Sequence, residues 1–159
     1  MFLKPDYNVK KVTEIDYGAL KAQGVKALLF DLDSTLMASK SGFYTQEIVE
    51  LIENLKKEFF VAIVSNNKNE QYIDKVTSIS DFPLLFNAGK PRVERVKKFL
   101  NSYSIEVKEC VLIGDRPLTD ILCGKLLGCR TILTDSVTAD TEAPIVRFVR
   151  AIERLTISK

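Results

Sequence analysis

Five short apolar runs alternate with segments of helical spacing along the chain. The runs cover residues 25–30, 59–64, 84–86, 110–113 and 130–134. Each is short and bounded by polar or turn residues, which predicts strands buried on both faces. Strands that alternate with helices form a parallel sheet with helices on both faces. We therefore expect an α/β fold with five parallel strands between two helical layers.

Capping residues indicate where several helices begin. Asp16 and Thr45 each precede a helical pattern, and Asn67 with Glu70 predicts a capping box. The helix after Asn67 is expected to run to about residue 77, with Tyr72 among its inward-facing residues. Two further helices are expected after Pro91 and up to Leu127, and a last one over 142–156. Residues 1–15 carry a poor signal and are expected to be irregular.

Polar residues follow four of the predicted strands. In chain order these are Asp31 with Asp33, Ser65, Lys90, and Asp115 with Asp120. Carboxyl ends of parallel strands meet at one edge of a sheet, where open α/β folds bind ligands. Each residue taken singly has an ordinary alternative as a turn residue, a helix cap, a solvated lysine or, for Asp120, an exposed first-turn residue. Their ordered recurrence at strand ends instead indicates one functional cleft.

Carboxylates packed into one cleft repel each other, and a bound cation relieves that repulsion. Oxygen ligands without nearby His or Cys favour a hard cation, Mg²⁺ above all. One aspartate could act as a nucleophile while its neighbour moves protons. Lys90 and Ser65 would then stabilise the oxygens of a phosphoryl group. The cluster therefore predicts phosphoryl transfer.

Composition excludes several other classes of protein. With 159 residues the chain fits one domain, 1–159, and the absence of histidine excludes His-based triads and His-liganded zinc. A net charge of +2 gives no reason to expect a nucleic-acid partner. The three cysteines lack the spacing of a metal site, which suggests reduced thiols that pack in or near the core. No apolar stretch approaches the roughly 20 residues of a membrane span. We expect a cytoplasmic protein, at most peripheral to a membrane.

The ordered set resembles the four motifs of the haloacid dehalogenase-like (HAD) phosphohydrolases. The motifs here are Asp31-Leu32-Asp33-Ser34-Thr35, Ile63-Val64-Ser65-Asn66, Lys90-Pro91, and Gly114-Asp115 with Asp120. The resemblance implies a Rossmann-like sheet whose 25–30 strand lies centrally, between the 59–64 and 110–113 strands. It also implies that Asp31 is the nucleophile that becomes an aspartyl phosphate and that Asp33 transfers protons.

The same resemblance assigns the remaining site residues. Mg²⁺ would be held by the Asp31 carboxylate, the Asp33 backbone carbonyl and Asp115. Phosphate would be bound by Ser65, Asn66 and Lys90. Thr35 and Asp120 would support the site, and whether Asp120 ligates the metal directly is left open.

No cap insertion fits between residues 35 and 65 or between 65 and 90, which resembles the capless HAD branch. Within it, the chain is similar to the YqeG-like family, related to the mitochondrial phosphatidylglycerophosphate phosphatases. The supporting features are Phe2-Leu3-Lys4-Pro5-Asp6, Val64-Ser65-Asn66-Asn67, Leu118-Thr119-Asp120 and Arg147-Phe148 with Arg150, Glu153 and Arg154. Ser34 and Arg116-Pro117 depart from the family pattern. The likeness implies hydrolysis of phosphatidylglycerophosphate to phosphatidylglycerol.

The predicted last helix has Ile145, Phe148, Val149, Ile152 and Leu155 on one face and Arg147, Arg150 and Arg154 roughly opposite. These arginines could meet anionic lipid head groups, or form an ordinary solvated face. A capless phosphatase for a soluble metabolite, phosphoprotein or nucleic-acid end is an alternative function. A non-catalytic binding protein is another, and the sequence gives no oligomeric state.

Overall fold

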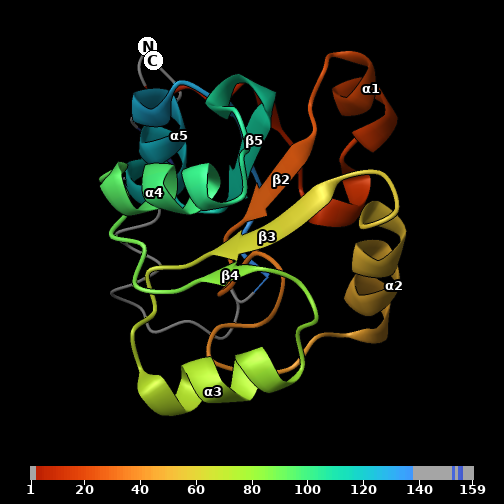
Figure 1. Cartoon of the computed structure of the whole chain (residues 1–159), viewed down its shortest axis with the longest axis vertical. Helices are drawn as coiled ribbons and strands as arrows, with labels where there is room; N and C mark the ends of the chain where they lie inside the picture. The colour runs from red at the N-terminus through yellow and green to blue at the C-terminus, as the bar shows by residue number, and fades with distance from the viewer. Residues whose placement is uncertain (1–2, 138–151, 153, 156–159) are drawn as a thin grey trace.

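A six-stranded parallel sheet forms the centre of the computed structural model, which describes residues 3–137, 152, 154 and 155 (Figure 1). Its strands are β1 (Tyr7–Asn8), β2 (Ala27–Phe30), β3 (Phe60–Val64), β4 (Leu84–Leu85), β5 (Cys110–Gly114) and β6 (Arg130–Leu133). The strand order is β1-β6-β5-β2-β3-β4. The central place of β2 between β3 and β5 is thus confirmed.

The expected number of five strands is wrong by one. β1 adds to the sheet beside β6, with Tyr7 paired to Ile132 and Asn8 to Leu133. This strand has only two residues, both exposed, so it lacks the apolar run by which a buried strand is recognised. Asp6 holds it in place, because its carboxylate accepts a hydrogen bond from the Thr131 backbone N–H at 2.8 Å.

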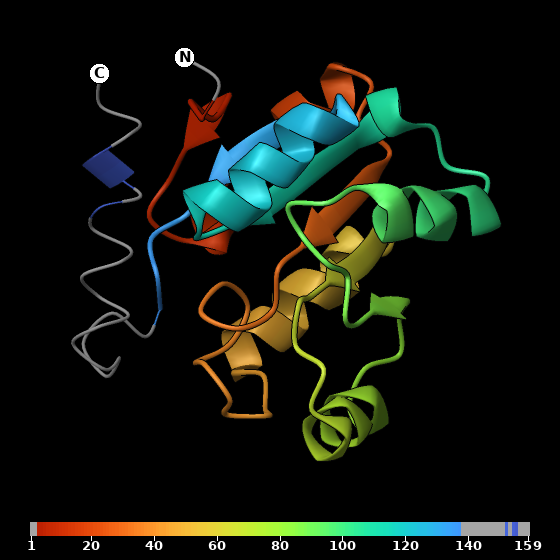
Figure 2. The ribbon, with the colours of Figure 1, turned by 90° about the vertical axis from the view of Figure 1, so that its left-hand side faces the viewer.

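Helices cover both faces of the sheet, as Figures 1 and 2 show. α1 (Tyr17–Ala22) and α2 (Gln46–Leu55) lie on one face, and α4 (Glu94–Ser102) and α5 (Leu122–Leu127) on the other. β2 serves both layers, since Leu28 and Phe30 pack toward α1 and α2 while Ala27 and Leu29 pack toward α4 and α5. Shorter helical turns are Val12–Glu14, Val107–Glu109 and the π-turn Pro117–Ile121. The predicted three-layer α/β/α fold is confirmed.

Two of the predicted helix caps are present and one is not. The side chains of Asp16 and Thr45 accept hydrogen bonds from Ala19 N at 2.9 Å and Ile48 N at 3.4 Å. α3 (Glu70–Ser78) is instead capped by Asn69. The capping box at Asn67 is therefore wrong. The side-chain oxygen of Asn67 accepts from Asn69 N at 2.9 Å, which shapes the loop before the helix.

Most of the predicted last helix, including Arg147 and Arg150, lies outside the described residues. Ile152 and Leu155, expected on the buried face, are 47% and 65% exposed. Arg154, expected to face outward, donates a hydrogen bond to the Thr134 carbonyl oxygen at 2.6 Å. For these three residues the predicted orientation is wrong. Arg154 turns inward because carbonyl groups at strand ends offer acceptors to its guanidinium. Within the described part of the chain, no helix has the length and hydropathy needed to cross a membrane.

Candidate active site

The register of the sheet brings three strand ends to the same level. Phe30 pairs with Ile63 of β3 and with Ile113 of β5. The next residue, Asp31, donates its backbone N–H to the Ile113 carbonyl at 2.8 Å. The loops that carry Ser65 and Asp115 start within two residues of these partners. The carboxyl edge of the sheet therefore collects the polar residues that the sequence places after each strand.

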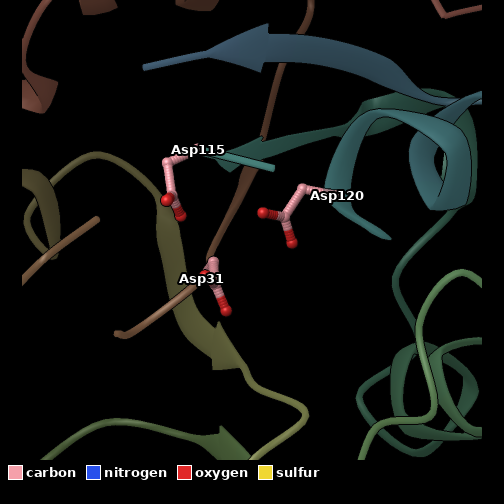
Figure 3. Close-up of side chains that lie close together, drawn as sticks. All are labelled: Asp31, Asp115 and Asp120. Atoms are coloured by element: carbon pink, nitrogen blue, oxygen red, sulfur yellow. The ribbon is translucent and has the colours of Figure 1, made fainter. Parts of the chain in front are cut away.

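Three aspartates form the centre of this edge. One carboxylate oxygen from each of Asp31, Asp115 and Asp120 lies within 4.8 Å of the others (Figure 3). Asp115 and Asp120 are fully buried. Asp120 comes from the π-turn after β5, so the alternative of an exposed residue in a first helical turn is wrong. The carboxylate cluster predicted from the strand ends exists in the folded chain.

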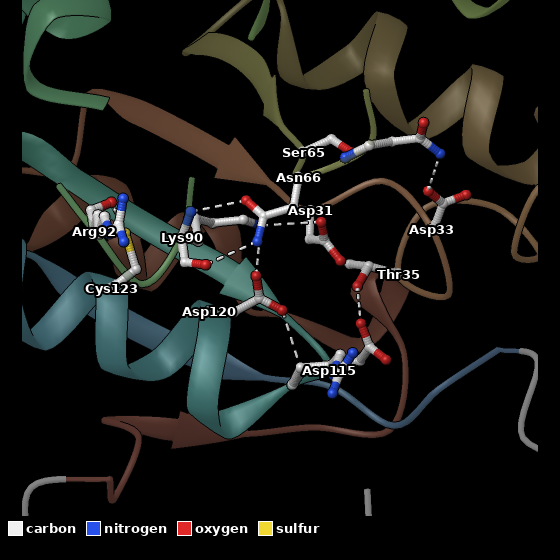
Figure 4. A network of polar contacts seen from close by, with 12 residues as sticks. Asp31, Asp33, Thr35, Ser65, Asn66, Lys90, Arg92, Asp115, Asp120 and Cys123 are labelled. Carbon is white, nitrogen blue, oxygen red and sulfur yellow. Dashed lines mark hydrogen bonds and ion pairs between the residues drawn. The ribbon is translucent and has the colours of Figure 1, made fainter. Parts of the chain in front are cut away.

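Lys90 enters the cluster from the loop after β4. Its ammonium lies 3.0 Å from an Asp31 oxygen and 2.6 Å from an Asp120 oxygen (Figure 4). Burial alone disfavours the ammonium, but the charges of Asp120 and Asp31 outweigh it and raise the pKa of Lys90 above its usual value. Lys90 is thus a buried, permanently charged cation, and a solvated surface lysine is excluded.

The charges of the cluster are not balanced by Lys90. Burial raises the pKa of Asp31 well above its usual value, and the neighbouring Asp120 and Asp115 raise it further, while Lys90 opposes them. One ammonium faces three carboxyl groups, so a second cation would stabilise their ionised forms. The donor set consists of carboxylate oxygens, which suit a hard divalent ion.

Asn66 holds the backbone of Lys90. Its amide nitrogen donates to the Lys90 carbonyl at 2.8 Å, and its amide oxygen accepts from the Lys90 N–H at 2.8 Å. The neighbouring Ser65 is buried, and its hydroxyl accepts from the Asn67 N–H at 3.1 Å. Asn66 therefore fixes the position from which Lys90 reaches Asp31.

Thr35 and Arg154 both contact Asp115. The Thr35 hydroxyl donates to an Asp115 carboxylate oxygen at 2.9 Å. The Arg154 guanidinium lies 3.5 Å from the Asp115 carbonyl oxygen and 3.6 Å from the Asp135 carboxylate. The contact of Arg154 was missed, because helical periodicity places a residue on a face without showing what that face meets.

The Asp33 carboxylate lies apart from the three-aspartate cluster (Figure 4). One oxygen accepts from the Lys40 N–H at 2.9 Å and from the Tyr72 hydroxyl at 2.6 Å. The other accepts from the Asn67 side-chain amide at 3.3 Å. Burial, and after it the nearby Asp33, raises the pKa of Tyr72, so the phenol stays protonated and can donate.

Sequence reasoning missed Tyr72 and Asn67 as site residues. Tyr72 belongs to the apolar stripe of its helix, and such aromatic residues usually contribute to a core. Its ring does pack against the core, but its hydroxyl reaches Asp33. The sequence did contain one sign of this role: Tyr72 places a hydroxyl on the apolar stripe of the helix that directly follows the Ser65 loop.

No large cap covers this edge among the described residues. The segment from β2 to α2 covers residues 31–45, and the segment from β3 to α3 covers 65–69. Both are too short to fold as a second domain. The expectation of a capless arrangement is confirmed.

Comparison with known families decides the identity of this site. A family model described as mitochondrial PGP phosphatase matches residues 1–138, which include every residue of the cluster. The chain belongs to this family. Family membership and fold together make the protein a HAD-type phosphatase, as the four motifs predicted.

Two relatives and one solved structure support the assignment. The probable phosphatase YqeG of Bacillus subtilis is 31% identical, with 99% of this chain and 91% of that protein covered. Phosphatidylglycerophosphate phosphatase 1 of Arabidopsis thaliana is 33% identical over 96% of this chain, which spans only 46% of that protein. A HAD-family enzyme from Bacteroides thetaiotaomicron, crystallised with magnesium and inorganic phosphate, has the same fold. The two structures align with a TM-score of 0.58 and 15% sequence identity, and the alignment covers 72% of this chain and 96% of that one.

Proposed function

We propose that this protein is a magnesium-dependent phosphomonoester hydrolase that acts on phosphatidylglycerophosphate through an aspartyl phosphate on Asp31. The observation that carries the proposal is the group formed by the partly exposed Asp31 and the buried Asp115 and Asp120, with the Lys90 ammonium 3.0 Å from Asp31. A carboxylate beside a fixed cation at an open sheet edge can attack a phosphoryl group whose charge that cation offsets.

In the proposed reaction, an Asp31 carboxylate oxygen attacks phosphorus as the ester P–O bond breaks. Asp33 gives a proton to the leaving alkoxide. Asp33 then takes a proton from water, the water oxygen attacks phosphorus, and the bond to Asp31 breaks to release inorganic phosphate. Ser65 and Lys90 bind the phosphoryl oxygens, and Asn66 contributes by holding the Lys90 backbone.

The residues present fit Mg²⁺, since the cluster offers only carboxylate oxygens. In this proposal the Asp31 carboxylate, the Asp33 backbone carbonyl and the Asp115 carboxylate hold the ion. When bound, Mg²⁺ supplies positive charge that offsets the phosphoryl oxygens. Thr35 orients Asp115, and Asp120 orients Lys90.

The lipid substrate rests on the relatives and on the lack of a large cap among the described residues. A relative in Arabidopsis thaliana is named a phosphatidylglycerophosphate phosphatase. A site without a lid cannot enclose a small substrate, so a phosphate presented by a membrane surface suits it better. We infer that residues 1–159 act as one HAD-like hydrolase domain, in the cytoplasm at the membrane surface.

The test compares purified protein on vesicle-borne phosphatidylglycerophosphate and on a panel of soluble phosphomonoesters. We expect preferred turnover of the lipid. Strong activity on one soluble metabolite, with none on the lipid, would favour the alternative capless phosphatase.

Asp31→Asn tests the covalent step. The amide keeps the size of the side chain but cannot attack phosphorus, so turnover should be abolished on every substrate while the melting temperature shows an intact fold. A variant that keeps a tenth of the wild-type kcat would rule out Asp31 as the nucleophile.

A further inference from the structure

We propose that Tyr72 is a positioning residue that fixes the Asp33 carboxylate for proton transfer. This inference rests on the proposed function, in which Asp33 serves as acid and base. Tyr72 lies outside the four motifs, on a helix that contributes none of the residues of the aspartate cluster.

Three segments of the chain meet at Asp33. The Lys40 backbone N–H comes from the loop after β2, the Asn67 amide from the loop after β3, and the Tyr72 hydroxyl from α3. The Tyr72 contact, at 2.6 Å, is the shortest of them. A length of 2.6 Å is at the short end of the usual range for an O–H···O hydrogen bond. Tyr72 therefore contributes the strongest of the three restraints.

Both the backbone and the side chain of Tyr72 are held in place. The backbone N–H of Tyr72 donates to the capping side chain of Asn69 at 3.0 Å, which fixes the first turn of α3. The ring packs against the core, and the hydroxyl also lies 3.4 Å from the Met37 sulfur. A rigid ring can aim its hydroxyl at little cost in side-chain entropy. The contact with Asp33 is thus built into the fold of α3.

Asp33 needs such a restraint because its side chain is partly exposed and the residue lies in the loop after β2, not in a strand or helix. Proton transfer requires the carboxylate within hydrogen-bond reach of the reacting oxygen. Well-placed acid–base groups contribute about 10²–10⁴ in rate. Loss of the Tyr72 hydrogen bond should remove part of this rate contribution, so we expect kcat to fall about tenfold. KM should change little, because the substrate contacts are retained.

Tyr72→Phe removes the hydroxyl and keeps the ring in the core. Tyr44→Phe is the matched control: Tyr44 is also half-buried against the same core, and its hydroxyl lies 2.8 Å from the Ser80 hydroxyl. We expect kcat on a soluble phosphomonoester such as p-nitrophenyl phosphate to fall about tenfold in Tyr72→Phe and to stay near wild type in Tyr44→Phe.

A double-mutant cycle separates positioning from a structural role. In an Asp33→Asn background, Tyr72→Phe should cause no further loss, because the group that it positions is gone. A full tenfold loss in that background would overturn the inference, as would a wild-type kcat in the single variant. A wild-type protein that turns over no phosphomonoester would instead overturn the proposed function, and this inference with it.

Discussion

Several proposed site residues each have a neighbour that holds them in place. Thr35 bonds the Asp115 carboxylate, Asn66 bonds the Lys90 backbone, and Asp120 bonds the Lys90 ammonium. The strand-end pattern predicted that Lys90, Asp115 and Asp120 converge, and the resemblance to HAD phosphohydrolases named Thr35 and Asp120 as supporting residues. Neither showed that Asn66 bonds the Lys90 backbone, because the sequence alone does not reveal the hydrogen-bond partner of a side-chain amide.

Gly114 allows the Asp120 carboxyl group to lie against the end of β5. A Cβ at position 114 would overlap the carboxyl carbon and oxygen of Asp120. Since Asp120 bonds Lys90, its displacement would also move the ammonium. We expect Gly114→Ala to destabilise the protein by about 1–3 kcal/mol, as overpacking does, and to lower kcat strongly.

Thermal unfolding and kcat measured together check this expectation. Gly18→Ala in α1 is the control, because its Cβ would meet only an Asp16 oxygen at 3.5 Å, an ordinary contact. It should leave kcat unchanged and stabilise the helix by up to about 1 kcal/mol. Equal effects of the two substitutions would show that the close approach at Gly114 is unimportant.

Among the elements, those with a strong apolar pattern were predicted well and β1 was not. β2, β3 and β5 are runs of buried residues, and each lies where the pattern placed it. β1 depends on Asp6 instead, whose carboxylate accepts from both the backbone N–H and the hydroxyl of Thr131. A strand of two exposed residues gives no periodic signal. The exposure of Ile152 and Leu155 was missed for a related reason, since periodicity shows faces but not their partners.

Asp6→Asn tests the attachment of β1. Partial burial acts to raise the pKa of Asp6, but the Thr131 backbone bond and Lys125 outweigh it, and the net pKa is lowered. A lowered folded-state pKa stabilises the fold above the unfolded value of about 4, and this contribution is lost as pH falls through the folded value. We expect the variant to be about 1 kcal/mol less stable at pH 7, after allowance for solvent screening.

Urea unfolding at pH 7 and at pH 3 measures the effect. The difference between wild type and Asp6→Asn should shrink at the lower pH, because the stabilising contribution of the Asp6 charge decreases once the pH is below the unfolded value of about 4. A difference that stays the same at both values would mean that the charge of Asp6 does not hold β1.

At the scale of the whole molecule, the sheet concentrates negative charge at one edge. Asp115 and Asp120 are fully buried there, and the Lys90 ammonium forms ion pairs with Asp31 and Asp120. The fold thus tolerates a local excess of carboxylates, which costs stability unless a cation joins them. We expect this arrangement to couple stability to metal binding as well as catalysis.

Magnesium should therefore raise the melting temperature as well as support turnover. At ten times its dissociation constant, a ligand of the folded state stabilises by about 1.4 kcal/mol, which is about 3–6 °C for a chain of this size. Calcium also prefers oxygen ligands, so it should give a similar shift, but its larger size and looser geometry should misalign the attack and inhibit turnover. Asp115→Asn should reduce the shift for both ions. Full activity after exhaustive chelation, or equal shifts in wild type and Asp115→Asn, would contradict a metal site at this cluster.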